Sequence, residues 1–328
     1  MKITMAHGSG GQETAVLIAS VFAKHLSNPI LARMEDSAVV EGAPMLAMTT
    51  DSFVVSPLFF PGGDIGRLSV CGTVNDLLMG GAVPRYLTCG FILQEGVDTE
   101  TLERVVASMA QAAQEAGVVV VAGDTKVIEG GGDLYINTAG VGFVREGVSV
   151  RASNCADGDV LLVSGTLGDH HAALLSERMG IRNTIRSDCA PLGEMVQALF
   201  DHGIRVKAMR DVTRGGLATI LNEFTAASHC GIEIGEVRLP VTEQVRSFCG
   251  ILGLDPLYMG NEGKLLAVVS GEDADRALAL MRASRYGEHA ALIGRITAED
   301  AGTVRLRTSL GGSRLIPPLY GEGLPRIC

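Results

Sequence analysis

The sequence predicts a two-domain protein of the α+β or α/β layered class with a C-terminal tail. Its 328 residues exceed what one ordinary hydrophobic core needs, and 47% of them are apolar. Apolar strands alternate along the chain with amphipathic helices, a pattern that favours layers over a bundle or a sandwich. We place an N-terminal domain at 1–150, a C-terminal domain at 151–308 and the tail at 309–328.

In the first domain the clearest element is a helix over 98–117. Asp98 can cap its start, Gly117 can end it, and apolar residues between them recur on one face. The other expected elements are a helix over 64–82 and strands over 45–51, 85–94, 118–125 and 134–144.

A polar, turn-rich stretch at 145–158 marks the domain boundary, before a strand at 160–165. The second domain is expected to have helices at 169–179, 193–202, 215–228 and 273–283, with strands near 232–237, 264–269, 291–296 and 303–308. From Ser309 onward the chain is rich in proline and glycine, which predicts neither a helix nor a continuous strand.

Charge and hydropathy exclude two classes of partner. A formal net charge of −10, with no run of Lys or Arg, argues against nucleic acid. The N-terminus lacks the apolar core of a signal peptide, and runs such as 118–122 are too short to span a bilayer. These features predict a cytoplasmic protein without a membrane partner.

Seven scattered cysteines without a C-x-x-C pair argue against a disulfide framework and a zinc finger. Six of them are expected to behave as small buried or half-buried apolar residues. Cys328 differs, because its neighbours in "GEGLPRIC" have the wrong composition for a core.

Five aspartates recur at strand ends or in Gly-flanked loops: Asp36, Asp51, Asp76, Asp124 and Asp211. A single such residue is usually a turn or cap residue. Five together suggest converging carboxylates, which require a cation, and Mg²⁺ with a nucleoside triphosphate is the common case.

The N-terminal "HGSGG" could bring backbone N–H groups of Gly8, Ser9, Gly10 and Gly11 to phosphates. The alternative is a merely flexible terminus. The chain contains no P-loop and no dinucleotide-binding fingerprint.

In their running order these motifs resemble an ATP-binding superfamily. The superfamily includes aminoimidazole ribonucleotide synthetase, selenophosphate synthetase and thiamine-monophosphate kinase. The matching motifs cover nearly the whole chain: "GSGG", "ED", "TTDS", "ND", "AGDT" and "DVTRGGL". With the terminal "PRIC", the chain resembles the carbamoyl dehydratases of [NiFe] hydrogenase maturation. The resemblance implies a PurM-like fold, in which a mixed-sheet N-terminal domain dimerises and an α/β C-terminal domain closes an ATP cleft.

The resemblance also implies a reaction. A carbamoyltransferase, HypF, would load a carbamoyl group onto Cys328, and ATP-dependent dehydration would convert it to a thiocyanate. The cyano group would then pass to iron on a HypC–HypD scaffold. The tail, about twenty residues long, would let Cys328 travel roughly 30–35 Å even when half extended.

Residue roles follow from that reaction. The five aspartates are the candidates for holding Mg²⁺ and phosphates, with Asn75 a lesser candidate for cofactor binding. Lys126 and Glu262, both in Gly-flanked turns, are the candidates for taking the amide protons, and the alternative for each is a solvated surface charge. His7 either faces phosphate or is simply exposed.

Other functions remain open at this level. A selenophosphate synthetase would need a reactive Cys with Lys near the glycine loop, and "AHGSGGQE" offers neither. A purine-pathway synthetase would not need the terminal cysteine. A non-enzymatic metal carrier would need a Cys or His partner in the tail. Prenylation requires a Cys four residues from the end, which excludes it.

Overall fold

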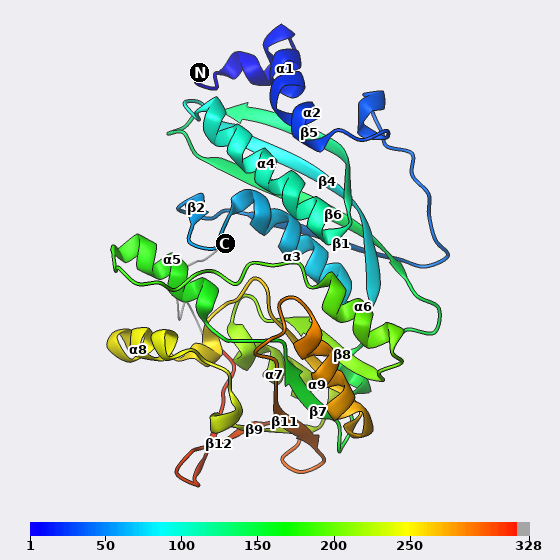
Figure 1. The fold of residues 1–328 in the computed structure, drawn as a ribbon, viewed down its shortest axis with the longest axis vertical. Coiled ribbons are helices and arrows are strands. Elements are labelled where there is room, and N and C mark those ends of the chain that lie inside the picture. The colour runs from blue at the N-terminus through cyan, green and yellow to red at the C-terminus, as the bar shows by residue number, and fades with distance from the viewer. Residues whose placement is uncertain (320–328) are drawn as a thin grey trace.

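The computed structural model describes residues 1–319, and within them the chain forms two large β-sheets (Figure 1). The first sheet has the strand order β1-β6-β4-β5. Its strands are β1 (Leu46–Phe53), β4 (Ala82–Gln94), β5 (Val119–Ile128) and β6 (Leu134–Val144). Only β4 and β5 run parallel, so this sheet is mixed as expected.

Two helices cover one face of the first sheet, α3 (Ile65–Met79) and α4 (Thr99–Ala116). Asp64 caps α3 by accepting hydrogen bonds from the backbone N–H groups of Gly66 and Arg67. Helix α3 is buried on nearly every side, because it lies between this sheet and the C-terminal domain (Figure 1). Asp98 occupies the N-cap position of α4, but its carboxylate binds Lys2 Nζ at 2.9 Å instead of the helix.

The other face of the first sheet is open. Along β1, the exposed side chains alternate with half-buried ones that face α3. Leu46 and Met48 of β1 and Ile92 of β4 are exposed at 47%, 74% and 41%. A row of apolar side chains therefore faces outward on this sheet.

A helical segment near the N-terminus packs against α4, and the sequence did not predict it. It consists of α1 (Gln12–Leu17), a π-helical turn (Ile18–Phe22) and α2 (Ala23–Leu26). Its short pieces carry no long amphipathic repeat, so periodicity alone does not reveal them.

The second sheet, within the described residues, has the order β13-β12-β9-β11-β7-β10-β8. Its strands are β7 (Val160–Val163), β8 (Val206–Asp211), β9 (Gly231–Gly235), β10 (Leu265–Val269), β11 (Ala291–Thr297), β12 (Val304–Arg307) and β13 (Ser313–Leu315). Its helices are α5 (Asp169–Met179), α6 (Gly193–Asp201), α7 (Gly216–Ser228), α8 (Glu243–Leu252) and α9 (Ala274–Ala283). The sequence did not predict β8 or α8, and the other helices match the expected ranges closely.

The start of the tail is more ordered than its composition predicts. Ser313–Leu315 forms an edge strand against β12, so the expectation of no strand beyond Ser309 is wrong for these residues. Ile316 is buried, and the Tyr258 hydroxyl donates to the carbonyl oxygen of Pro317 at 2.8 Å. Residues 320–328, including Cys328, lie outside the described residues.

The cysteines behave as expected in the part of the chain that is described. Cys71, Cys89, Cys155, Cys189 and Cys249 are buried, Cys230 is half-buried, and all six are free thiols. No helix in residues 1–319 has the length and apolar character needed to cross a membrane.

Candidate active site at the domain junction

Three of the candidate aspartates meet where the two domains join. Asp51 lies on the α3-facing side of β1, Asp76 lies near the end of α3, and Asp211 ends β8, which packs against α3. Burial raises the pKa of all three carboxyls. The pKa of Asp211 rises to about 7, because burial is reinforced by the negative charges of Asp76 and Asp51.

Several groups stabilise the negative charge of this cluster. The Thr49 hydroxyl donates a 2.7 Å hydrogen bond to Asp76 Oδ2, which lowers the pKa of Asp76. The guanidinium groups of Arg210 and Arg214 act in the same direction. Arg214 belongs to the "DVTRGGL" motif, but the sequence did not single it out as a functional residue.

The donor set of the cluster fits Mg²⁺, which prefers carboxylate oxygen. Within residues 1–319, no three His, Cys, Asp or Glu side chains are placed to hold a metal ion by themselves. Magnesium commonly takes only one or two carboxylates and completes its coordination with water and phosphate oxygens. The cluster therefore suits a metal ion that arrives with a nucleoside triphosphate.

Glu262 lies beside this cluster and is buried, with 5% of its surface exposed. The alternative that it is a solvated surface charge is therefore wrong. Burial raises its pKa well above the usual range, and the charges of Asp211, Asp188 and Asp51 add to the effect. A buried carboxyl whose pKa is raised by its surroundings is a candidate for proton transfer, because its carboxylate is a stronger base than that of an exposed glutamate.

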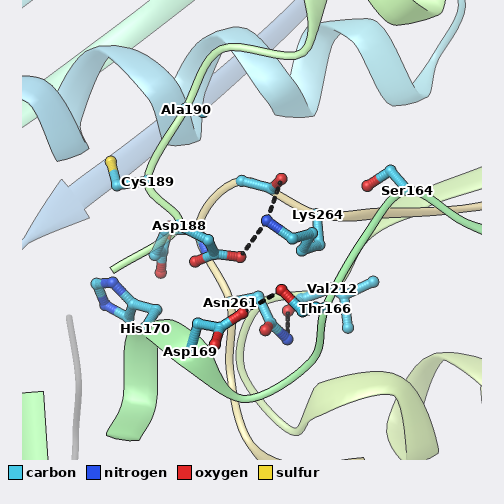
Figure 2. A network of polar contacts seen from close by, with 12 residues as sticks. Ser164, Thr166, Asp169, His170, Asp188, Cys189, Ala190, Val212, Asn261 and Lys264 are labelled. Carbon is cyan, nitrogen blue, oxygen red and sulfur yellow. Dashed lines mark hydrogen bonds and ion pairs between the residues drawn. The ribbon is translucent and has the colours of Figure 1, made fainter. Parts of the chain in front are cut away.

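A network of polar contacts surrounds Asn261 and Lys264, which lie on either side of Glu262 in the sequence (Figure 2). Lys264 Nζ lies 3.1 Å from Asp188 Oδ2, with both side chains more than nine-tenths buried. Asn261 accepts a hydrogen bond from the Gly168 N–H through Oδ1 and donates through Nδ2 to the carbonyl oxygen of Val212. These bonds join the loops that follow β7 and β8 to the segment preceding β10.

The side chain of Asn75 connects the two domains. Its Nδ2 donates to the carbonyl oxygen of Ala190 at 3.0 Å and approaches that of Glu262 at 3.5 Å. Its Oδ1 accepts the Leu192 N–H at 2.9 Å. The amide is thus engaged with the C-terminal domain, an arrangement that suits positioning better than direct contact with a cofactor.

Asp124 and Lys126 lie on the opposite face of the first sheet from Asp51. The register pairs Asp51 with Thr138, Thr138 with Cys89 and Cys89 with Gly123, so these residues share the α3-facing side. Asp124 is one residue further along and points to the open face. It pairs with Lys126 at 3.0 Å, which lowers its pKa, and both side chains are 67% exposed.

Asp36 lies apart from the junction as well. It lines a pocket of about 540 Å³ formed by the N-terminal helical segment, the loop at 30–39 and strands β4 and β5. Phe22 and Phe91 contribute apolar surface to this pocket, and Thr14 and Asp124 contribute polar groups. The five aspartates therefore do not converge within one protomer, because β5 and β1 are opposite edges of the sheet.

The N-terminal glycine motif packs against β5. A Cβ on Gly8 would lie 2.8 Å from the backbone nitrogen of Val127, so this position needs glycine. Ser9 Oγ donates to the carbonyl oxygen of Ala6, and the Gly10 N–H donates to Thr14 Oγ1. Gly10 has φ +80, and Gly11 is the N-cap residue of α1.

His7 is buried, and its Nδ1 accepts a hydrogen bond from the Thr4 N–H at 3.1 Å. The alternative that it is simply exposed is therefore wrong, and the bond makes it part of the local backbone structure.

Besides Arg210 and Arg214, sequence reasoning missed four residues at the junction: Thr49, Asp188, Asn261 and Lys264. Asn261 and Lys264 flank Glu262 in the "GNEGK" stretch. That stretch was therefore the available signal for two of the four. Asp188 gave none, because an acid before a cysteine in a loop has no characteristic pattern.

Family models match both halves of the chain. The model described as "AIR synthase related protein, N-terminal domain" matches residues 34–144, and that described as "AIR synthase related protein, C-terminal domain" matches residues 156–307. Together they cover most of the chain. With the two-sheet fold and the acidic junction, they place it in the AIR synthase related class, whose fold is PurM-like.

Full-length relatives define the family more narrowly. The chain is 48% identical over 336 residues to "Carbamoyl dehydratase HypE" of Escherichia coli (strain K12), covering 99% of each. A solved structure titled "Hydrogenase Maturation Protein HypE in complex with ATP" is 47% identical, with a TM-score of 0.95 and 99% of each chain covered. A chain of a "HypE-HypF complex" is 46% identical, with a TM-score of 0.81, covering 92% of this chain and 99% of that one. The chain belongs to the carbamoyl dehydratase HypE family of hydrogenase maturation enzymes.

Proposed function

We propose that this protein dehydrates an S-carbamoyl group on Cys328 to a thiocyanate at the expense of ATP, and so supplies the cyanide ligands of [NiFe] hydrogenase. The observation that carries the proposal is the buried Glu262 beside Asp51, Asp76 and Asp211 at the domain junction. This arrangement supports the proposal, because the reaction needs a group that accepts protons and a metal-bound triphosphate close to it.

The reaction proceeds in two balanced steps. In the first, the carbamoyl oxygen forms a bond to the γ-phosphorus of ATP, ADP leaves, and the nitrogen loses one proton to a base. In the second, the nitrogen loses its other proton, the C–O bond breaks, phosphate leaves, and a C≡N bond forms. ATP and the S-carbamoyl group become ADP, phosphate and the thiocyanate, with no change in oxidation state.

Each residue at the junction has a role in this scheme. Asp51, Asp76 and Asp211 would hold Mg²⁺, which when bound neutralises charge on the transferring phosphoryl group. Arg214 faces the same carboxylates and is available to the phosphates. Glu262 takes the nitrogen protons, because its raised pKa makes its carboxylate a stronger base than a surface glutamate.

We infer that the nucleoside of ATP occupies the pocket lined by Asp36 and Asp124. Its volume of about 540 Å³ lies within the ordinary range of ligand pockets, and its apolar lining with polar groups suits a nucleoside. Gly8, Ser9, Gly10 and Gly11 lie in the segment that leads into the helical wall of this pocket.

This pocket and the junction cluster can serve one ATP only if two protomers share the site. Asp51 and Asp124 lie on opposite faces and three strand positions apart, which is about 14 Å at the usual strand spacing. Lys126 also points to the open face, away from the Glu262 of its own protomer. We therefore propose that Lys126 and Asp124 act at the junction cluster of the partner protomer.

The open face of the first sheet supports homodimerisation. Its exposed Leu46, Met48 and Ile92 form the kind of apolar surface that an association buries. We propose residues 1–150 as the ATP- and magnesium-binding dimerisation domain and residues 151–308 as the domain that closes the cleft.

The partners follow from the same reaction. We propose that HypF carbamoylates Cys328 and that a HypC–HypD complex receives the cyano group, in a cytoplasmic location. Cys328 is the ninth residue after the described Leu319, and nine residues span about 30 Å when fully extended. Residues 313–317 are held by the second domain, so Cys328 can reach a shorter distance than it could if the chain were free from Ser309 onward.

Mass spectrometry of the C-terminal peptide tests the proposal. After incubation with HypF, ATP and carbamoyl phosphate, Cys328 should carry a carbamoyl group that then loses the mass of one water. Dehydration should stop when ATP is withdrawn after carbamoylation. Cys328→Ala should abolish both modifications and still bind ATP, whereas the half-buried Cys230→Ala should retain both. Failure of both mass changes in the unaltered chain would leave the proposal without support.

A further inference from the structure

The buried ion pair between Asp188 and Lys264 has no part in the chemistry proposed above. The two side chains are 4% and 8% exposed, and Lys264 Nζ lies 3.1 Å from Asp188 Oδ2 (Figure 2). Lys264 also donates to the carbonyl oxygen of Gly263 at 3.3 Å. Charges this deeply buried are expensive to desolvate, and apolar residues of the same volume often stabilise a protein equally well. The pair therefore calls for a reason beyond filling space.

The second carboxylate oxygen of Asp188 supplies that reason. Asp188 Oδ1 accepts a hydrogen bond of 3.0 Å from the backbone N–H of Glu262. Asp188 thus holds Lys264 through one oxygen and the main chain of Glu262 through the other. Because Lys264 lies two residues after Glu262, the ion pair and the hydrogen bond fix the same short segment.

The backbone is tightly packed at the same place. A Cβ built on Gly263 would lie 1.9 Å from the carbonyl oxygen of Asp188, so the two segments touch main chain to main chain. From the other domain, Asn75 Nδ2 on α3 donates to the carbonyl oxygen of Ala190 and approaches that of Glu262. Glu262 is therefore held at its N–H by Asp188 and approached at its carbonyl by Asn75.

We propose that Asp188 is a positioning residue for the dehydration step. It orients Glu262 toward the reacting carbamoyl nitrogen by fixing the Glu262 N–H, and Lys264 keeps the Asp188 carboxylate in the orientation that this bond requires. The inference rests on the proposed function, because it assigns Asp188 to the residue that takes the protons. It adds Asp188 to the residues that act in the reaction, although Asp188 contacts neither ATP nor the carbamoyl group.

A positioning role predicts a specific pattern of loss. Displacing a catalytic group by about 1 Å can slow a reaction about 100-fold while leaving binding intact. Removing Asp188 should therefore slow dehydration without weakening ATP binding. Carbamoylation of Cys328 should also continue, because the partner enzyme performs that step at its own site.

The experiment follows a single turnover of the full-length protein after it has been carbamoylated by HypF. It measures the rate of water loss at Cys328, the Kd for ATP and the final extent of carbamoylation. Asp188→Ala should lower the dehydration rate about 10- to 100-fold and leave the other two values within about twofold. Asp188→Asn keeps an acceptor oxygen for the Glu262 N–H and should recover a large part of the lost rate. Lys264→Met should fall between the two.

Two further variants make the outcomes separable. Asp201→Ala removes an acid that pairs with Arg145 at the surface and should behave as the unaltered protein. Glu262→Gln tests the proposed function itself: an unchanged rate there removes Glu262 as the base. If Glu262→Gln is slow but Asp188→Ala is as fast as the unaltered protein, only the positioning role is overturned. If both Asp188 variants lose ATP binding together with the dehydration rate, Asp188 has a structural role, and the positioning role is also overturned.

Discussion

The Thr49 hydroxyl on β1 donates a 2.7 Å hydrogen bond to Asp76 Oδ2 on α3. This bond lowers the pKa of an acid whose pKa is otherwise raised by burial, and so favours the charged form that a metal ion needs. Thr49→Val should therefore weaken Mg²⁺–ATP binding about tenfold, measured by titration calorimetry at neutral pH. Thr49→Ser should retain the affinity. Thr50→Val removes a hydroxyl that bonds the Thr138 carbonyl instead and is the matched control.

Asp211→Asn should have opposite effects on stability and on function. The pKa of Asp211 is about 7 in the folded protein, above its ordinary value of 3.8. The folded state binds more protons than the unfolded state between these values, so stability without metal falls as pH rises through this window. Asparagine does not ionise, so the variant keeps the stability that the parent loses as pH rises. Without metal, the variant should therefore be more stable than the parent at pH 8 by on the order of 1–3 kcal/mol.

The same variant should bind Mg²⁺–ATP poorly, because the cluster has lost a carboxylate. Thermal melts at pH 5.5 and pH 8, with and without Mg²⁺–ATP, measure both effects. A variant that is less stable than the parent at pH 8 without metal would contradict the raised pKa of Asp211, which burial causes first and the neighbouring carboxylates reinforce.

His171 on α5 should make the fold sensitive to acid. Burial lowers its pKa to about 4, with smaller contributions from His170 and Arg178, against an ordinary 6.5. The unfolded state then binds more protons between pH 6.5 and pH 4, so stability is lost as pH falls through that range. The loss amounts to on the order of 3 kcal/mol. Denaturant melts of His171→Asn should show a shallower acid dependence, and substitution of the exposed His202 should leave it unchanged.

Gly263→Ala and Gly250→Ala should change stability in opposite directions. A Cβ at Gly263 meets the Asp188 carbonyl oxygen at 1.9 Å, whereas Gly250 in α8 has open space around it. The first substitution should cost more than about 2 kcal/mol or prevent folding. The second should stabilise the protein by about 0.5–1 kcal/mol, because alanine restricts the unfolded chain and favours the helix. Urea melts measure both, and equal values would contradict the close packing at Gly263.

A site shared between protomers can be tested by complementation. If Lys126 serves the cluster of the partner protomer, Lys126→Met and Glu262→Gln homodimers should both be inactive. Mixed dimers should regain activity, because one of their two sites keeps both residues. The assay is dehydration at Cys328 after co-refolding and purification of tagged heterodimers. No recovery in verified heterodimers would place Lys126 and Glu262 in the same protomer's site or remove one from the reaction.

Local patterns revealed most of the regular elements. The helix over 98–117 and the strand over 134–144 were visible because their apolar periods are long and end at clear turn signals. Strand β8 and helix α8 were missed. Lys207 and Arg210 interrupt the apolar run of the six-residue strand. Helix α8 is as long as the predicted α9, so length does not explain why it was missed.

The sequence by itself determined the superfamily order of motifs, the two-domain layered architecture and the five candidate aspartates. These are properties of residue type and spacing, which the chain carries before it folds. Only the tertiary structure decided which acids meet. The pairing register sends Asp51 and Asp124 to opposite faces of one sheet, and a one-residue offset in register is not visible in residue order. Burial of Glu262 and its bond to Asp188 depend likewise on contacts between segments about 74 residues apart, which no local pattern encodes.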